Sequence, residues 1–237
     1  MRHVAFDHIA IAVPRMADAP AFLVGVLGGA PYRGSDSGVY RWAQWRFEGG
    51  GLIEILEPQG RDGFLHRFLT ARGAGVHHVT FKAADLDAAC ARARAHGYDV
   101  VGRDDSDDDW KEAFLHPRQA QGIVVQMAQP GARGGVPRQA IALPSGPPSP
   151  PPPARIVGLV VSARSADRAL AQWRDVLGGE VVAQDARAIL VRWPESPMRI
   201  AVTIDATAAE GPVAVEVTAE RPLDLSAQPF FRQVENL

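Results

Sequence analysis

An internal repeat constrains the fold of this chain more than any other feature of its sequence. The stretch FDHIAIAVP (residues 6–14) is matched by VHHVTFKAA (residues 76–84). Each is followed by a helical stretch and then by a β-rich segment, which is GLIEILEP (residues 51–58) in the first copy and GIVVQMAQP (residues 122–130) in the second. The repeating unit is therefore a strand, a helix and about three strands, which we call a βαβββ module.

The C-terminal part of the chain repeats the module in a reduced form. RIVGLVVSA (residues 155–163) predicts the strand, SADRALAQWRDVLGG (residues 165–179) the helix, and AILVRWPESPMRIAVTID (residues 188–205) the closing strands. A fourth copy begins at GPVAVEVTAERPLD (residues 211–224). We therefore expect an α+β protein with two full modules and a further degenerate one.

A proline-rich segment, QPGARGGVPRQAIALPSGPPSPPPPA, separates the two parts. Prolines lack the backbone donor and fix φ, so neither a helix nor a central strand can run through this segment. The sequence predicts a domain of two modules over residues 1–128, a semi-rigid linker over residues 129–154, and a degenerate, truncated module over residues 155–237.

Composition and charge exclude several classes of function. The net charge of -2 gives no reason to expect a nucleic acid or an anionic membrane surface as a partner. No apolar run reaches the roughly 18 residues needed to span a bilayer. The single cysteine, Cys90, excludes an internal disulfide and fits a reducing cytoplasm, where we expect the protein to act.

Four polar side chains interrupt the apolar pattern at equivalent places in the two repeats. Because strand side chains alternate between two faces, His8 and His78 fall on the face lined by small residues, and Glu54 and Gln126 share a face in the closing strands. The separations agree, with 46 residues from His8 to Glu54 and 48 from His78 to Gln126. If a pseudo-twofold relates the modules, the four side chains converge.

This set of donors suits a divalent metal ion bound by nitrogen and oxygen, with positions left for water or substrate. The absence of thiolates favours Mn, Fe, Co, Ni or Zn in a non-structural site and leaves the identity open. A single histidine on a strand is more often a hydrogen-bonded core residue, and a single glutamate can be an edge charge. All four in register favour a metal site, because a buried carboxylate without a partner is costly.

Paired modules with this ligand layout resemble the vicinal oxygen chelate superfamily, which includes lactoylglutathione lyase, methylmalonyl-CoA epimerase, extradiol dioxygenases and fosfomycin- and bleomycin-resistance proteins. The motifs most resemble the epimerase branch over residues 3 to about 130: DHIAIAVP, IEILEP, GVHHVTFKAADLDAA and FLHPRQAQGIVVQM. The resemblance implies a glyoxalase-like half-barrel, a divalent metal ion, and the ligands His8, Glu54, His78 and Gln126.

The resemblance also shows where this chain departs from the epimerases. The position of Gln126 is typically glutamate in that branch, so the carboxylate here lies in the first module, and Glu54 is the candidate catalytic base. The branch has a further glutamate on the third strand of the first module, but the matching segment GVYRWAQWRF has none. Tyr40, Trp42 and Trp45 in this segment are candidates for an aromatic substrate pocket, although aromatic residues in strands are usually core.

Other loops carry weaker signals. The run DDSDDD (residues 104–109) replaces a glycine-rich loop of the epimerases and would repel a phosphate-rich ligand such as CoA. His116 and Arg118 match a family loop near the substrate and are candidate substrate contacts.

The degenerate module has Gly158 at the position of His8 and Ala201 roughly at that of Glu54, and the truncated fourth copy has Ala214 at that of His78, so this half should bind no metal. An open half-barrel would expose strand edges, so we predict a homodimer or tight docking within the chain.

Three functions remain open at this point. The first is a metal-dependent lyase or isomerase that binds a small substrate through two vicinal oxygens and shifts a proton next to a carbonyl. The second is an Fe(II) extradiol dioxygenase with His8, His78 and Glu54 as a two-histidine, one-carboxylate triad. The third is a metal-free protein that binds a small molecule without turnover. Fold alone does not choose among them.

Overall fold

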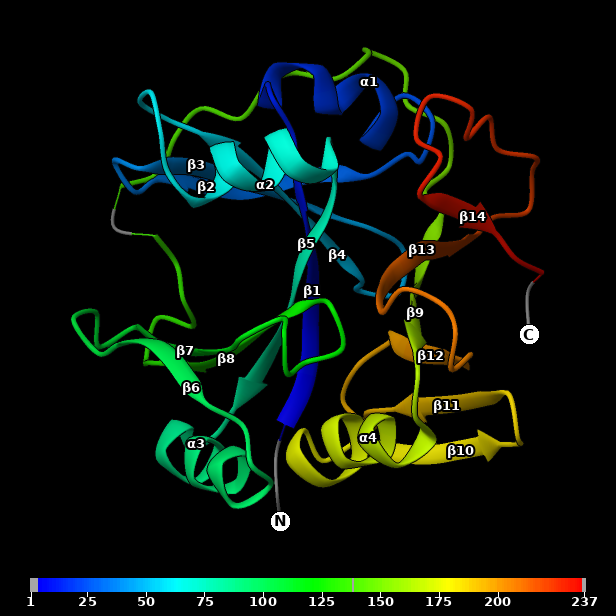
Figure 1. The fold of residues 1–237 in the computed structure, drawn as a ribbon. Coiled ribbons are helices and arrows are strands. Elements are labelled where there is room, and N and C mark those ends of the chain that lie inside the picture. Colours follow the sequence, from blue (N-terminus) through cyan, green and yellow to red (C-terminus); the bar gives the residue numbers. More distant parts are fainter. Residues whose placement is uncertain (1–3, 138, 236–237) are drawn as a thin grey trace. The chain divides into compact units, whose positions relative to one another are not determined.

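The computed structural model describes residues 4–137 and 139–235, and it shows an α+β protein with two sheets and short helices (Figure 1). One sheet has eight strands in the order β2-β3-β4-β1-β5-β8-β7-β6, and the other has six in the order β10-β11-β12-β9-β13-β14. The predicted fold class is confirmed, including the repeated modules.

The elements follow the predicted repeat. The first module contains β1 (Val4–Ala12), η1 (Met16–Asp18), α1 (Ala19–Leu23), β2 (Ala30–Asp36), β3 (Tyr40–Arg46) and β4 (Leu52–Pro58). The helix α2 (Phe64–Arg72) connects it to the second module, which contains β5 (Gly75–Ala83), α3 (Leu86–Ala95), β6 (Val100–Asp104), β7 (Trp110–Leu115) and β8 (Val124–Pro130).

The third module has the same order of elements. It contains β9 (Arg155–Ala163), α4 (Ala166–Leu170), the π-helical turn η2 (Ala171–Val176), β10 (Glu180–Gln184), β11 (Ala188–Arg192) and β12 (Arg199–Ile204). Two further strands follow, β13 (Gly211–Thr218) and β14 (Phe231–Gln233). Among the described residues, no helix combines the length and the apolar character that crossing a membrane requires.

The helix ends show why the repeat is visible in the sequence. Asp85 caps α3 by accepting a hydrogen bond from the backbone of Ala88, and Ser165 caps α4 in the same way with Arg168. Gly97 and Gly178 follow these helical stretches with φ of +81° and +71°, a backbone conformation that glycine adopts without a steric penalty.

In each full module the first strand pairs in parallel with the last. Ala10 on β1 lies opposite Glu54 on β4, and Thr80 on β5 lies opposite Gln126 on β8. The remaining strands pair as antiparallel hairpins, so that Gln44 on β3 lies opposite Glu54, and Phe114 on β7 lies opposite Gln126. The polar residues are thereby brought onto neighbouring strands of their own module.

The chain divides into two compact units, each assembled from segments far apart in the sequence. Unit 1 contains Met1–Asp7, His78–Val136 and Gly158–Ala214, and unit 2 contains His8–His77, Pro137–Val157 and Val215–Leu237. Each unit therefore joins most of one full module to part of the C-terminal half. The predicted boundaries at residues 128 and 155 stay a prediction.

In unit 1, buried polar contacts attach the third module to the second. The side chain of Gln121 donates to the carbonyl oxygen of Arg168 and to the amide oxygen of Gln172, which in turn donates to the carbonyl of Ala120. Arg92 on α3 donates to the carbonyl of Val176 at 2.6 Å, and α3 and α4 lie close together in Figure 1. Intrachain docking is thus present inside this unit.

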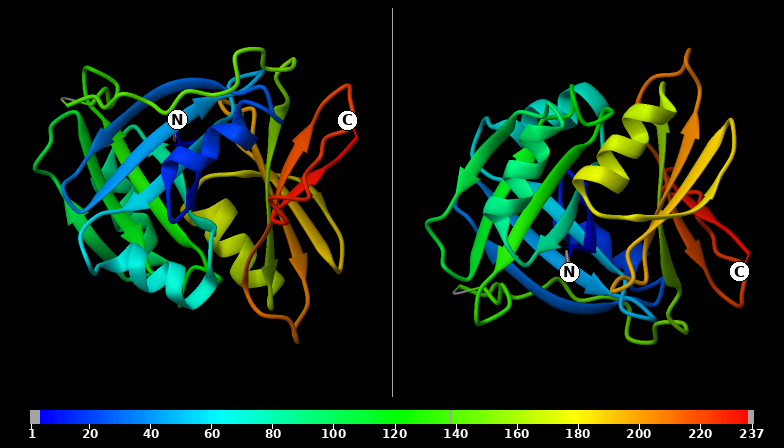
Figure 2. Two further views of the ribbon diagram at one scale, coloured as in Figure 1. Left: turned by 90° about the horizontal axis from the view of Figure 1, so that it is seen from above. Right: turned by 90° about the horizontal axis from the view of Figure 1, so that it is seen from below.

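In unit 2, the proline-rich segment lies along the first module (Figure 2). Ser35 on the outer strand β2 donates to the carbonyl of Gln139 at 2.6 Å, and the backbone of Ile141 donates to Gly34. Gly28 has φ of +70° and abuts the carbonyls of Pro151 and Pro152, where a Cβ atom would collide. The segment therefore covers part of an edge strand that would otherwise be open to pairing.

Candidate metal centre

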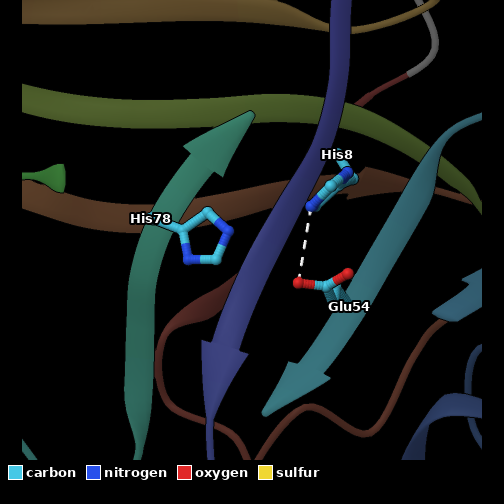
Figure 3. A group of neighbouring side chains, drawn as sticks. All are labelled: His8, Glu54 and His78. Carbon is cyan, nitrogen blue, oxygen red and sulfur yellow. Dashed lines mark ion pairs between the residues drawn. The ribbon is translucent and has the colours of Figure 1, made fainter. Parts of the chain in front are cut away.

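Three buried side chains form a group that could hold a metal ion. His8 on β1, Glu54 on β4 and His78 on β5 each offer one ligand atom, and these atoms all lie within 4.8 Å of one another (Figure 3). The three residues are 2%, 7% and 7% exposed. The structure therefore brings together three of the four ligands that the sequence predicts.

In the first module, the carboxylate of Glu54 lies between the imidazole of His8 and the side-chain amide of Gln44. Its Oε1 lies 3.5 Å from Nε2 of His8, and its Oε2 accepts a hydrogen bond of 2.8 Å from the amide of Gln44. The amide oxygen of Gln44 accepts from Arg33 at 2.8 Å. The guanidinium, the amide and the carboxylate thus form a chain across three adjacent strands, which fixes the orientation of Glu54.

In the second module, the predicted ligand Gln126 is buried and held at both ends. Its Oε1 accepts a hydrogen bond of 2.5 Å from the hydroxyl of Thr80, and its Nε2 donates to Oε2 of Glu112 at 2.6 Å. The indole N–H of Trp110 donates to the same Oε2 of Glu112 at 2.9 Å. Gln126 is 7% exposed and Thr80 is fully buried.

Glu112 was missed by the sequence analysis. In the stretch WKEAFL (residues 110–115), alternation places Trp110, Glu112 and Phe114 on one side of β7, and the pairing of Phe114 with Gln126 shows that this is the side of Gln126. A carboxylate that alternates with Trp110 and Phe114 in this stretch was the signal available in the sequence.

The three aromatic residues proposed for a substrate pocket lie on opposite faces of strand β3. Tyr40 and Trp42 are partly buried and pack against a cluster that also includes Phe68 and Leu69 of α2 and the residues Ala10, Ala12, Leu56 and Leu65. Trp45 is fully buried and, by alternation from Trp42, faces away from this cluster, so its prediction as a pocket residue was wrong. The small residues Ala10 and Ala12 follow His8 on the same face of β1.

His77, the neighbour of His78, packs against aromatic rings. Its imidazole lies 5.5 Å from the ring of Phe64 and 5.0 Å from that of Phe68. Burial lowers the pKa of His77 to about 4, although the charge of Glu54 acts in the opposite direction. His77 is therefore neutral at neutral pH and extends the apolar surface beside the candidate site.

His116 and Arg118 lie in the exposed turn between β7 and β8. The backbone N–H of Arg118 donates to Nδ1 of His116, and the neighbouring residues Gln119 and Ala120 accept hydrogen bonds from the third module. No contact places either side chain against the metal group among the residues that the structure describes, and their role in substrate binding stays a prediction.

The third module has no room for a ligand at the position of His8. Gly158 has φ of +151°, and a Cβ atom there would overlap the carbonyl oxygen of Arg199 on the adjacent strand. Ala201 on β12 occupies the position of Glu54, and Ala214 on the following strand β13 occupies that of His78. This part of the chain keeps the fold of the module without its polar face.

The donor set fits a divalent ion. Imidazole nitrogen and carboxylate oxygen bind such ions at about 2.0–2.2 Å, so two ligands of one ion lie at most about 4.4 Å apart. Separations of up to 4.8 Å require only small side-chain movements to reach this geometry. The amide oxygen of Gln126 would complete a set of two nitrogen and two oxygen donors without a thiolate.

Comparison with known proteins places the chain in a family. The model of the glyoxalase/bleomycin resistance protein/dioxygenase superfamily matches residues 7–114. The ethylmalonyl-CoA/methylmalonyl-CoA epimerase of Cereibacter sphaeroides is 32% identical over 130 residues, which represent 52% of this chain and 96% of that protein. This chain belongs to the glyoxalase/bleomycin resistance protein/dioxygenase superfamily.

Two solved structures are also similar to this chain, and one of them matches nearly its whole length. The methylmalonyl-CoA epimerase of Mycobacterium tuberculosis is 25% identical and superposes with a TM-score of 0.51, covering 54% of this chain and 89% of its own. A hypothetical protein from Staphylococcus aureus is 11% identical with a TM-score of 0.64, covering 99% of this chain and 100% of its own. The second match shows that the fold of the C-terminal half also occurs elsewhere.

Proposed function

We propose that this protein is a metal-dependent isomerase or lyase that binds a small substrate through two vicinal oxygens and moves a proton next to a carbonyl. The observation that carries the proposal is the buried group of His8, Glu54 and His78. The relatives named as epimerases support the isomerase class over the lyase class.

His8, Glu54, His78 and Gln126 are the proposed ligands. The proposed ion is Mn, Fe, Co, Ni or Zn, and elemental analysis identifies it. When bound, such an ion polarises a carbonyl oxygen and stabilises the negative charge that develops when a neighbouring C–H bond is broken. The two imidazoles would act as ligands in their neutral form.

Glu54 is the proposed base when it swings off the metal ion, because it is the carboxylate of the group and Gln126 cannot accept a proton at neutral pH. Its Oε2 accepts from Gln44 and its Oε1 faces His8. Gln44 therefore orients the carboxylate, and Oε1 is the atom nearer the ligands. A proton taken from the substrate carbon would reside on Glu54 and return to a neighbouring atom of the substrate on the same side, because a single base cannot deliver it to the opposite face.

The aromatic cluster supports a proposal about the rest of the substrate. Tyr40 and Trp42 are partly exposed on the face that carries Ala10 and Ala12, two and four residues beyond His8. An apolar or flat group of the substrate would pack against the exposed parts of these two rings. His116 and Arg118 remain proposed substrate contacts, without a role in the chemistry.

The wider setting is also proposed. Residues 1–128 hold the site and residues 155–237 support it, as a homodimer or as a single chain that docks on itself. The contacts inside unit 1, such as Gln121 with Gln172, support the second arrangement. A single buried cysteine supports a reducing cytoplasm as the compartment.

The test combines metal analysis with proton exchange. The purified protein and a His78→Ala variant are assayed for Mn, Fe, Co, Ni and Zn. We expect about one ion per chain in the first and a loss in the second. The loaded protein is then incubated in D2O with methylmalonyl-CoA and with smaller 2-substituted carboxylic acids. Deuterium at the carbon next to the carbonyl, absent with Glu54→Gln, supports the proposal. No metal after soaking, or metal without exchange in any substrate, contradicts it.

The composition of the group favours one alternative, an Fe(II) extradiol dioxygenase. Two histidines and one carboxylate are the ligands of such iron sites. Cleavage of a catechol ring would place both atoms of O2 in the product. Oxygen consumption with catechols and ferrous iron, without exchange in D2O, would favour this alternative. Tight binding of aromatic ligands with neither reaction would favour a binding protein.

A further inference from the structure

A carboxylate outside the proposed ligand set lies against one of its members. Glu112 on β7 accepts the amide N–H of Gln126 at 2.6 Å through Oε2, and the indole N–H of Trp110 reaches the same oxygen at 2.9 Å. On the other side, the buried hydroxyl of Thr80 on β5 donates to Oε1 of Gln126 at 2.5 Å. Gln126 is thus held between β7 and β5, which flank its own strand β8 (Figure 1).

These contacts determine which end of the amide faces which strand. An amide has a donor end and an acceptor end, and only the oxygen can bind a metal ion. A carboxylate only accepts hydrogen bonds, and the indole of Trp110 only donates them. Because Trp110 and Gln126 both donate to one oxygen of Glu112, the NH2 group of Gln126 must face β7. Its carbonyl oxygen is therefore turned toward β5.

The direction of the carbonyl oxygen matters because β5 also carries His78. His78 and Thr80 are two residues apart and share a face of that strand. The amide oxygen is thus turned toward the strand that supplies a proposed ligand, and the nitrogen is turned away from it. If the amide were rotated by 180°, its NH2 group would face this strand and would repel a cation.

We propose that Glu112 is a positioning residue that presents the carbonyl oxygen of Gln126 as the fourth metal ligand. This inference rests on the proposed metal site. Glu54 needs no such partner to select an atom, because its two carboxylate oxygens are equivalent. A second carboxylate close to the site also strengthens the attraction for a divalent cation, so the test must separate orientation from charge.

The test measures the affinity for Co2+ alone in the full chain, with the visible absorption of the bound ion as the signal. Glu112→Leu removes both the charge and the acceptor, and we expect the dissociation constant to rise about 10- to 100-fold, as for other outer-shell partners of metal ligands. Glu112→Gln removes the charge and keeps an oxygen that can accept from Gln126. If orientation dominates, this variant loses less affinity than Glu112→Leu.

The decisive variant is the double substitution Gln126→Glu with Glu112→Leu. A carboxylate at position 126 has two equivalent oxygens, so it no longer needs Glu112 to select one. We expect the double variant to bind Co2+ with an affinity within a few-fold of the wild type. A purely structural role of Glu112 would instead leave the double variant as weak as Glu112→Leu, and that result would overturn the inference.

A second readout follows the amide directly without a metal. In 15N-labelled protein, the side-chain NH2 of Gln126 should exchange slowly with solvent, and Glu112→Leu should accelerate the exchange at least about 10-fold, while the folded spectrum is retained. Wild-type protein that binds no Co2+ refutes the proposed function together with this inference. Wild-type binding that Glu112→Leu leaves unchanged refutes the inference alone.

Discussion

The first and second modules offer the same two kinds of polar group with their roles exchanged. In the first module the proposed ligand is the carboxylate of Glu54, and the amide of Gln44 supports it. In the second module the proposed ligand is the amide of Gln126, and the carboxylate of Glu112 supports it. Each module therefore contributes one glutamate and one glutamine.

The exchange is not a simple swap of positions. Gln44 lies directly opposite Glu54 in the hairpin, whereas the residue opposite Gln126 is Phe114. Glu112 lies opposite Ala128, two residues further along β8, and reaches back to Gln126. Both modules thus have one hydrogen-bonded pair of a carboxylate and an amide, although the supporting residue lies at a different position of its strand in each.

The third module shows how far the fold tolerates the loss of this face. Glycine replaces the first histidine at Gly158, where the adjacent backbone leaves no space for a side chain. Apolar packing of strands and helix is therefore sufficient to keep the architecture of this module without the proposed ligands.

Removal of each proposed ligand is the most severe way to compare the two modules. We expect Glu54→Ala to weaken Co2+ binding more than about 100-fold, because outer-shell changes already cost up to that factor. Gln126→Ala should cost about 10-fold, because a neutral amide attracts a cation less than a carboxylate does. Equal losses would contradict the ranking. Glu48→Gln, an exposed carboxylate beyond the end of β3, is the control.

Gln126→Glu would place two carboxylates in contact in the second module. At about 4 Å, two like charges repel by about 4 kcal/mol at an effective dielectric constant of 20. We expect the metal-free variant to lose about 2–4 kcal/mol of unfolding free energy in urea at pH 8. The loss should diminish as the pH falls toward about 4.3, where one carboxyl takes a proton.

Adding Glu112→Gln to Gln126→Glu removes the second carboxylate and should therefore remove the repulsion. The double variant has a carboxylate supported by an amide, as in the first module, and we expect its unfolding free energy to return to within about 1 kcal/mol of the wild type. A double variant as unstable as Gln126→Glu would show that repulsion from Glu112 was not the cause.

The supporting residues themselves should differ in importance. Gln44→Leu removes a hydrogen bond to a charged acceptor, and such bonds are roughly twice as strong as neutral ones. Thr80→Val removes a bond to a neutral amide oxygen and preserves the shape of the side chain. We expect Co2+ affinity to fall about 10-fold or more in the first variant and less in the second. The opposite order in Co2+ titrations would show that the first module does not depend on Gln44.

Much of this organisation could be predicted from the sequence because of the repeat. Two aligned strands with one histidine each, and two closing strands with one polar residue each, were enough to select His8, Glu54, His78 and Gln126. The caps Asp85 and Ser165 accept hydrogen bonds from backbone groups three residues further along, so features of this kind depend only on local sequence.

The supporting residues were harder to predict, because they depend on strand register. Glu112 does not occupy the position equivalent to Gln44 of the first module, so the repeat does not point to it. It pairs with Ala128, and its side chain extends back by two residues to reach Gln126. Trp45 was misplaced for a related reason. An aromatic residue in a strand belongs to either face until the register is known, and the pairing of Trp45 with Ile53 places it in the core.

The reactivity of Cys90 reports on local opening of the second module alone, because the first module has no thiol. We expect this effect to be smaller than those of the substitutions. The thiol is buried on α3, and burial raises its pKa. We expect a disulfide reagent at pH 8 to modify native protein at least about 100-fold more slowly than urea-unfolded protein. Bound Co2+ should slow the reaction further if His78 and Gln126 are ligands, since binding stabilises only the closed module.

The raised pKa of Cys90 also fixes the sign of its contribution to stability. At pH values above about 8.5 the unfolded thiol loses its proton first, so the native state binds more protons and the unfolding free energy falls as the pH rises. Cys90→Ala should remove this alkaline slope in urea titrations between pH 8 and pH 10. An unchanged slope in the variant would show that other groups cause it. Rapid labelling of native protein would show that the second module opens readily in the absence of a metal ion.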